Sequence, residues 1–182
     1  MPENPRADLL SLIVANAVVH GAVTLSSGQQ ADYYVDLRRV TLSAAGAPLV
    51  GEVMLDLTDG LEFEAVGGLT LGADPIADAM LHAAAARGRQ LDAFVVRKEG
   101  KAHGLQRRIE GPDVAGRRVL VVEDTTTTAG SPLAAVQALR DAGAEVVAVA
   151  TIVDRDTGAG ERIHAEAGLD YRFVYRKDEL GL

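Results

Sequence analysis

Cysteine is absent from the 182 residues of this sequence. Its absence excludes catalysis by a thiolate, zinc sites built on cysteine and disulfide bonds, and it points only weakly to a compartment, the cytoplasm. Long apolar runs are missing too, since every apolar segment is too short to span a bilayer. The first six residues are polar and acidic, whereas a secretory segment is basic and then apolar. We therefore expect a cytoplasmic protein with no signal peptide and no membrane partner.

Positive charge is also scarce, with 18 Lys and Arg against 26 Asp and Glu, for a formal net charge of -8. Such a chain lacks the positive field that nonspecific nucleic-acid binding requires, so we expect no nucleic-acid partner. The sequence contains neither GxxxxGK[ST] nor GxGxxG. These absences exclude a nucleotide P-loop and a Rossmann fingerprint.

What is present is the alternation of helical and extended segments within one domain, residues 1–182. Residues 23–37 are expected to form two short strands around a Ser-Gly turn. The pattern predicts helices at about 7–19, 44–58, 74–86, 132–142 and 161–167, and strands at 64–66, 91–96, 119–122, 145–153 and 171–175. Strands separated by helices favour an α/β fold with a central, mostly parallel sheet, whose ligands bind beyond the carboxyl ends of the strands.

The most informative stretch is 119–131, Val-Leu-Val-Val-Glu-Asp-Thr-Thr-Thr-Thr-Ala-Gly-Ser. Its apolar run predicts a buried strand that ends at two acids, Glu123 and Asp124. Ser131 followed by Pro132 predicts a helix N-cap with proline at the first helical position. Free N–H groups at a helix start favour an anion such as a 5′-phosphate, and the acids can accept hydrogen bonds from ribose hydroxyls. The alternative is an acidic strand end with a threonine-rich turn and no ligand.

This stretch resembles the signature of the type I phosphoribosyltransferases, which bind 5-phospho-α-D-ribose 1-diphosphate (PRPP). The resemblance implies that Glu123 and Asp124 contact the ribose hydroxyls. It also implies a small N-terminal hood, formed by about 1–40 and 155–182, and a flexible catalytic loop. One departure is Ala129, where the family usually has glycine, because alanine is strained if that position needs positive φ. The residues implied to hold the 5′-phosphate are Thr125, Thr126, Thr127, Thr128, Ala129, Gly130 and Ser131.

Seven of the 18 Lys and Arg residues fall within 97–118, against three acids. Such a segment buries little, which is typical of a mobile loop that closes over an anion, although a solvated charged loop is the alternative. Arg-Lys-Glu-x-Lys-x-His-Gly resembles the catalytic loop of the orotate members of the family. The resemblance implies that Arg97 and Lys98 contact the diphosphate in their own subunit. Lys101 and His103 are implied to reach the site of a neighbour, which requires a homodimer.

A second glycine-rich loop, residues 67–75, follows another predicted strand. Glycine lets backbone N–H groups approach an oxyanion closely. By its place in the chain this loop resembles the diphosphate-binding loop of the family, with Thr70, Leu71 and Gly72 as the implied contacts. A tight strand-to-helix turn without a ligand is the alternative.

The segment Asp-Tyr-Tyr-Val-Asp-Leu-Arg, residues 32–38, resembles the lining of the pyrimidine pocket. The resemblance implies that Tyr34 and Val35 bind orotate through backbone groups and a flat wall. Tyrosines in a strand are more often core or surface residues. A departure lies at Ser26, where many orotate enzymes have a lysine.

Arg155 follows the strand predicted at 145–153, and its planar fork suits a carboxylate such as that of orotate. The family has an arginine at the matching place, and Thr127 is implied as the second contact to the base. The alternative for Arg155 is a surface salt bridge with Asp154 or Asp156.

Together these resemblances imply an enzyme that transfers the phosphoribosyl group of PRPP to orotate, giving orotidine 5′-monophosphate and diphosphate. The implied catalytic residues are Lys101, His103 and Asp124. The implied cofactor is Mg²⁺, which PRPP and water hold near Glu123 and Asp124, so that no direct protein ligand is expected. Two rival readings stay open: a phosphoribosyltransferase for another base, and a regulator of the same fold that senses PRPP.

Overall fold

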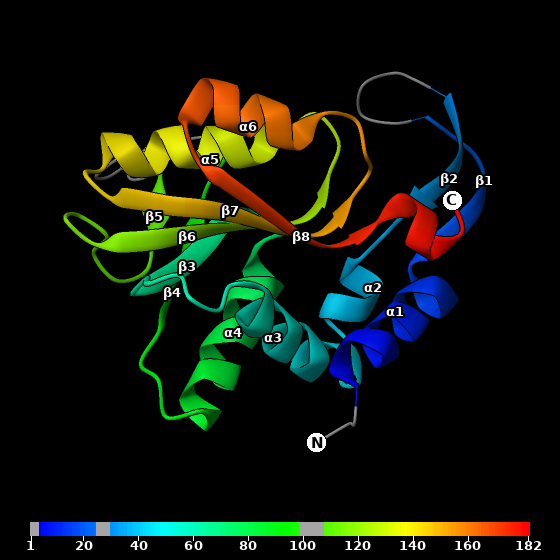
Figure 1. Cartoon of the computed structure of the whole chain (residues 1–182), viewed down its shortest axis with the longest axis horizontal. Coiled ribbons are helices and arrows are strands. Elements are labelled where there is room, and N and C mark those ends of the chain that lie inside the picture. Colours follow the sequence, from blue (N-terminus) through cyan, green and yellow to red (C-terminus); the bar gives the residue numbers. More distant parts are fainter. Residues whose placement is uncertain (1–3, 25–29, 99–107) are drawn as a thin grey trace.

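The computed structural model describes residues 4–24, 30–98 and 108–182. Its centre is a six-stranded sheet with the order β5-β4-β3-β6-β7-β8 (Figure 1). Every neighbouring pair is parallel except β4 and β5, so the predicted α/β class with a mostly parallel sheet is confirmed. The strands are β3 (Ala65–Leu69), β4 (Asp92–Val96), β5 (Ile109–Glu110), β6 (Arg118–Thr126), β7 (Glu145–Asp154) and β8 (Asp170–Arg176).

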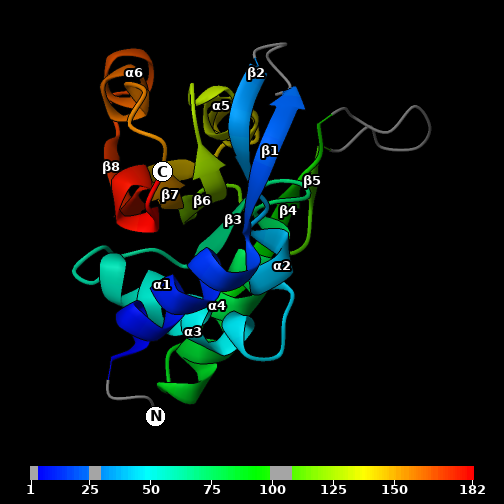
Figure 2. The same ribbon diagram turned by 90° about the vertical axis from the view of Figure 1, so that its right-hand side faces the viewer.

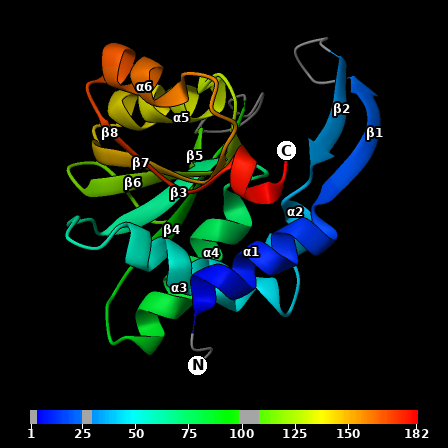
Figure 3. The same cartoon turned by 45° about the vertical axis from the view of Figure 1, so that its right-hand side comes forward.

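Helices cover both faces of this sheet, with α5 and α6 on one side and α1, α3 and α4 on the other (Figures 1 and 3). None of the helices within the described ranges is both long and apolar enough to cross a membrane. The helices are α1 (Pro5–Asn16), α2 (Arg38–Thr41), α3 (Gly46–Leu57), α4 (Asp74–Ala86), α5 (Gly130–Asp141) and α6 (Ala159–Ala167), followed by the 3₁₀ helix η1 (Lys177–Leu180).

The apolar run of β6 supplies both cores. Val119 and Val121 pack beneath α5 and α6, while Leu120 and Val122 pack toward α3 and α4, because successive side chains of a strand point to opposite faces. All four side chains are fully buried, and each contributes ~1.5–3 kcal/mol relative to exposure. Burial on both faces of the sheet explains why this run is continuously apolar. It also fixes the position of the carboxyl end of β6.

A separate antiparallel hairpin, β1 (Val18–Thr24) and β2 (Gln30–Val35), stands apart from the main sheet (Figures 2 and 3). The helix predicted over about 7–19 was too long, since α1 ends at Asn16 and Val18 already pairs with Val35. The reason is that β-branched residues favour strands when a partner strand is available.

The strand predicted at 119–122 was too short. β6 continues to Thr126 because Glu123, Thr125 and Thr126 pair with β7 as parallel neighbours of Thr151, Val153 and Asp154. Likewise β3 continues through two glycines to Leu69, whereas the sequence predicted its end at residue 66. Pairing with neighbouring strands therefore carried both elements further than their apolar residues indicated.

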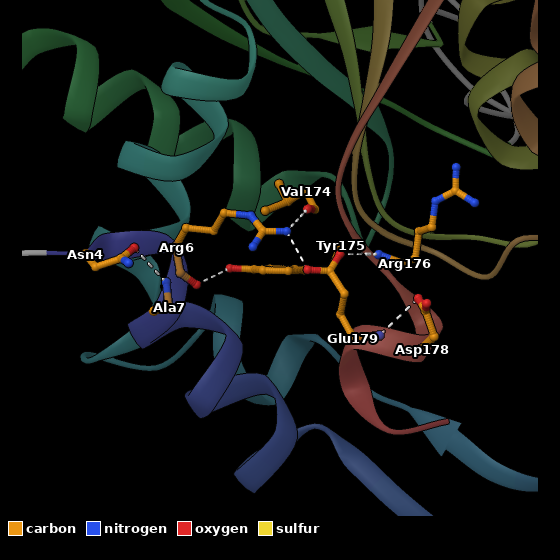
Figure 4. A network of polar contacts seen from close by, with 8 residues as sticks. All are labelled: Asn4, Arg6, Ala7, Val174, Tyr175, Arg176, Asp178 and Glu179. Atoms are coloured by element: carbon orange, nitrogen blue, oxygen red, sulfur yellow. Dashed lines mark hydrogen bonds and ion pairs between the residues drawn. The ribbon is translucent and has the colours of Figure 1, made fainter.

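The N-terminal helix is fastened to the C-terminal end of the chain through Arg6 (Figure 4). Its Nη2 donates to Val174 O at 2.9 Å and to Glu179 Oε2 at 2.6 Å, and Tyr175 Oη donates to Arg6 O at 2.5 Å. The guanidinium also lies 4.7 Å from the centroid of the Tyr175 ring. The terminal segments predicted to form the hood are thus joined to each other, while their role as a hood over a site stays a prediction.

Candidate active site

The loop after β3 lies directly against Glu123 and Asp124, which we call the acid pair. A Cβ atom placed on Gly72 would lie 2.8 Å from Glu123 Oε1 and 2.9 Å from Asp124 Cγ, closer than real Cβ atoms approach. A side chain at position 72 would displace the carboxyl groups of the acid pair, so glycine allows this close approach. The Thr70–Leu71 peptide of the same loop is cis. The structure thus brings the predicted diphosphate loop and the predicted ribose-binding acids together.

The carboxyl groups of the acid pair have little access to solvent. Glu123 is 6% exposed, and its burial, together with the charge of Asp124, raises the pKa of Glu123 to about 8. Burial also raises the pKa of Asp124, although the N–H of Thr125, 2.6 Å from Oδ1, and the positive charge of Arg38 oppose that rise. At neutral pH the pair consequently keeps a proton in the absence of a ligand. A cationic or hydrogen-bond-donating ligand favours its full ionisation.

A stability measurement tests this electrostatic state. The Glu123 carboxyl loses its proton near 4.5 when unfolded but near 8 when folded, so between these values the folded chain binds the extra proton. Stability from this group is therefore present at low pH and falls as pH rises toward 8. We expect Glu123→Gln to have a higher Tm than the parent at pH 8, with ~2–4 °C for each kcal/mol in a chain of this size. Thermal unfolding at pH 5, 6.5 and 8 measures it.

The difference in Tm between Glu123→Gln and the parent should shrink toward pH 5, where the folded forms of both proteins carry a neutral side chain at position 123. Asp78→Asn on the exposed face of α4 is the matched control and should show no such trend. A difference that stays constant from pH 5 to 8 would contradict the raised pKa of Glu123.

The turn between β6 and α5 differs from the prediction at its cap. Helix α5 begins at Gly130, and its N-cap is Ala129 in the left-handed region, with φ 58. The predicted N-cap at Ser131 is wrong, because the positive φ of Ala129 lets the chain enter the helix two residues earlier. The expectation of strain at Ala129 is confirmed, at ~1–2 kcal/mol for a residue with a Cβ. Burial of its methyl group, 1% exposed in the core under α5, offsets part of this cost.

Backbone N–H groups line this turn, and we call residues 127–131 the phosphate loop. Within the described ranges, the N–H groups of the phosphate loop donate to no protein acceptor. Backbone N–H groups without an acceptor at the start of a helix attract an anion. The loop therefore has the geometry of an anion cradle beside the acid pair.

The four threonines that precede Ala129 are not equivalent. Thr126 is buried and its hydroxyl is 2.6 Å from Thr151 Oγ1, so this side chain joins β6 to β7 and faces away from solvent. Thr125 Oγ1 is buried and has no partner in the described part of the chain. Thr127 and Thr128 stand in the turn itself. Of the predicted hydroxyl donors, Thr126 is already committed to the fold.

Arg155 lies beside the strand that carries the predicted base-binding tyrosine. Arg155, at the end of β7, lies with its guanidinium 5.1 Å from the centroid of the Tyr33 ring in β2. Tyr34 follows on that strand, and Val35 is buried and pairs with Val18 of β1, so the roles of Tyr34 and Val35 in binding a base stay predictions. In the described residues Arg155 forms no ion pair with Asp154 or Asp156. Asp156 pairs instead with Arg176, at 3.3 Å. The salt-bridge alternative for Arg155 is not what the structure contains.

One functional candidate, Arg38, was missed in the sequence. Its Nε donates to Asp36 Oδ1 at 2.9 Å and its Nη2 to Tyr34 Oη at 3.2 Å. Its charge also favours the ionised form of Asp124. Arg38 thus links the predicted base-binding tyrosine to the acid pair. The available signal was its position as the last residue of the segment 32–38.

The charged loop is described only at its two ends. Arg97 donates its backbone N–H to Arg108 O at 2.7 Å, and Arg108 Nη2 reaches Lys98 O at 3.5 Å. Lys101 and His103 lie outside the described residues, as does Ser26. Their predicted roles, and the interpretation of this segment as a closing loop, stay predictions.

Comparisons with known proteins decide the family. Residues 56–171 match the model of the phosphoribosyl transferase domain. The chain is 72% identical over 180 residues to the orotate phosphoribosyltransferase of Streptomyces avermitilis, with 99% of each chain covered. The chain belongs to the phosphoribosyltransferase family, in its orotate branch. The predicted family is therefore confirmed.

Solved structures agree with this assignment to the phosphoribosyltransferase family. The Mycobacterium tuberculosis orotate phosphoribosyltransferase in complex with Fe(III) dicitrate is 59% identical, with a TM-score of 0.89 over 98% of this chain and all of that one. The same enzyme in complex with PRPP is 53% identical in the alignment, with a TM-score of 0.85 over 98% and 100% of the two chains. The adenine phosphoribosyltransferase of Thermoanaerobacter pseudethanolicus, at 14% identity and a TM-score of 0.65, shares the fold. The predicted type I phosphoribosyltransferase fold is confirmed.

Proposed function

We propose that the site at the carboxyl edge of β3, β6 and β7 transfers the phosphoribosyl group of PRPP to orotate. The products are orotidine 5′-monophosphate and diphosphate. The observation that carries this proposal is the contact of the Gly72 loop with the acid pair, next to N–H groups of the phosphate loop that have no acceptor among the described residues. PRPP consists of a diphosphate, a ribose and a 5′-phosphate. The Gly72 loop suits the diphosphate, the acid pair suits the ribose, and the phosphate loop suits the 5′-phosphate.

The chemistry asked of the site is electrostatic. As the bond between the anomeric carbon and diphosphate loosens, positive charge develops on the ribose, and the carboxylate of Asp124 stabilises it. N–H groups of the phosphate loop hold the distant end of the sugar, so that the reacting carbon stays in line with the base. Arg155, oriented by the Tyr33 ring, offers two parallel donors to the carboxylate of orotate. No covalent intermediate with the protein is required.

Mg²⁺ is part of this proposal. The described residues include no cluster of three or more acids and histidines able to hold a metal ion. They do offer hard oxygen atoms in the acid pair and in Asp74, whose buried Oδ1 has no partner within those ranges. Such a set suits an ion carried in by PRPP with water in its shell, where Asp74 and the acid pair bind that water. When bound, Mg²⁺ supplies positive charge that stabilises the departing diphosphate.

A homodimer in the cytoplasm completes the proposal. Arg97 and Lys98 are placed at the end of β4, next to the segment that carries Lys101 and His103. We assign Lys101 and His103 to the diphosphate in the site of the partner subunit, where their charge stabilises the leaving group. A closed loop also excludes water that would hydrolyse the activated sugar.

A panel of bases in a diphosphate-release assay tests the proposal. With PRPP and Mg²⁺ present, we expect orotate to support release at least ~100-fold faster than uracil, adenine or hypoxanthine, because only orotate has the carboxylate that pairs with Arg155. Arg155→Gln should raise the KM for orotate at least ~10-fold and leave the KM for PRPP nearly unchanged. Arg140→Gln, at the far end of α5, is the matched control.

The release assay, together with a measurement of PRPP binding, distinguishes the two rival functions. Faster release with a purine or with uracil would identify a phosphoribosyltransferase for another base. Binding of PRPP without release for any base would identify a regulator that senses PRPP. Either outcome contradicts the proposed transfer to orotate.

A further inference from the structure

The carbonyl groups of Thr126, Thr127 and Thr128, at the start of the phosphate loop, are all bound from one side. Thr126 O accepts from the backbone N–H of Arg155 at 3.1 Å, and Thr128 O accepts from Arg162 Nη1 at 2.6 Å. Between them, Thr127 O accepts from the hydroxyl of Thr157. All three donors belong to the stretch that runs from the end of β7 into α6, residues 155–162. Three consecutive carbonyls are therefore held by one neighbouring segment.

This arrangement decides where the N–H groups of the loop point. In a planar trans peptide the C=O of one residue and the N–H of the next point in opposite directions. Carbonyls 126, 127 and 128 face the stretch 155–162, so N–H groups 127, 128 and 129 face away from it. Within the described ranges these N–H groups donate to no protein acceptor. Binding the carbonyls from behind thus presents the donors to a ligand in front.

Arg162 is itself held in position. Its Nε lies 2.7 Å from Glu166 Oε1, one helical turn further along α6, so the guanidinium is fixed at both of its edges. Thr157 stands just before the N-cap of α6, Gly158, which has a φ of 82. Neither side chain has a role derived from the sequence.

We propose that Arg162 and Thr157 are positioning residues for the phosphate monoester of the substrate. They act through the phosphate loop and do not touch the ligand. They order a turn that contains the strained Ala129. Because the turn is already ordered before PRPP binds, binding costs less conformational entropy. The inference rests on the proposed function only in naming PRPP as the ligand. The anion site itself rests on the backbone geometry alone.

Steady-state kinetics of Arg162→Ala test this role. We expect a KM for PRPP about 10-fold higher, with kcat and the KM for orotate within about 2-fold of the parent, because the loop holds the sugar phosphate and not the base. Arg162→Lys keeps a cationic donor and should recover part of the affinity. Glu161→Gln, exposed on the same turn of α6, is the matched control.

A second pair of variants tests the same role with a smaller risk that the substitution disturbs folding. Thr157→Val removes the donor at nearly constant volume, whereas Thr157→Ser keeps it, so only the first should raise the KM for PRPP. An unchanged KM for PRPP in Arg162→Ala combined with Thr157→Val would overturn the inference. So would a fall in kcat with the KM for PRPP constant, because that would place these residues in the chemical step.

Binding of inorganic phosphate separates this inference from the proposed function. Calorimetry with phosphate as the probe needs no turnover, and we expect affinity about 10-fold weaker in Arg162→Ala than in the parent and the Glu161→Gln control. Equal affinity in all three proteins overturns the inference, even if orotate is converted. Failure of the parent to release diphosphate with orotate overturns the proposed function, while weaker phosphate binding by the variant still supports the inference.

Discussion

Asp124→Asn is expected to lower kcat with PRPP and orotate by ~10²- to 10³-fold, with a much smaller change in the KM for PRPP. Asparagine still accepts a hydrogen bond from a ribose hydroxyl, so binding of the ground state is largely kept. It has no negative charge to stabilise the positive charge that develops on the ribose in the transition state. The effect is large because burial of the acid pair weakens screening by water. Initial rates at saturating PRPP and Mg²⁺ measure it.

Glu123 modifies this result in a predictable way. The charge of Asp124 contributes to the raised pKa of Glu123, so its removal favours ionisation of Glu123. Glu123 can then replace part of the missing charge, and the combined variant Glu123→Gln with Asp124→Asn should be slower than Asp124→Asn alone. Asp78→Asn is the control and should be fully active. Activity of Asp124→Asn within about 3-fold of the parent would contradict the assigned role of Asp124.

An equal mixture of Lys101→Ala and Asp124→Asn chains is expected to regain about a quarter of the parent activity, although each variant alone is nearly inactive. If Lys101 acts in the site of its partner, each mixed dimer has one intact site of two. Random exchange makes about half of the dimers mixed, which gives the factor of about a quarter. Co-expression or subunit exchange, followed by the diphosphate-release assay, measures the recovery.

A complementary mixture distinguishes shared sites from dilution. Parent chains mixed in equal amount with chains that carry both substitutions should fall to about a quarter of parent activity if Lys101 serves the partner. They should fall to about a half if every site is complete within one chain. No recovery in the first mixture, together with a half in the second, would contradict both the shared site and its dependence on a homodimer.

The acid pair illustrates what the sequence could determine. A continuous apolar run followed by two acids requires a doubly covered strand that ends in a polar site, since carboxylates are not buried without a reason. The same logic placed the Gly72 loop at the same edge, because parallel strands bring their carboxyl ends together. Both placements follow from local patterns, and both agree with the structure.

The sequence by itself therefore determined the α/β class, the family, and the edge of the sheet where the site lies, because these depend on residue pattern and on order along the chain. Tertiary structure alone decided the length of β6, the positive φ of Ala129, the electrostatic interaction of Arg38 with Asp124 and the contact of Arg162 with the phosphate loop. The length of β6 and the contact of Arg162 depend on partners distant in sequence, which are β7 for β6 and the phosphate loop for Arg162. Local preference is worth a fraction of a kcal/mol per residue, and pairing and packing with distant segments outweigh it.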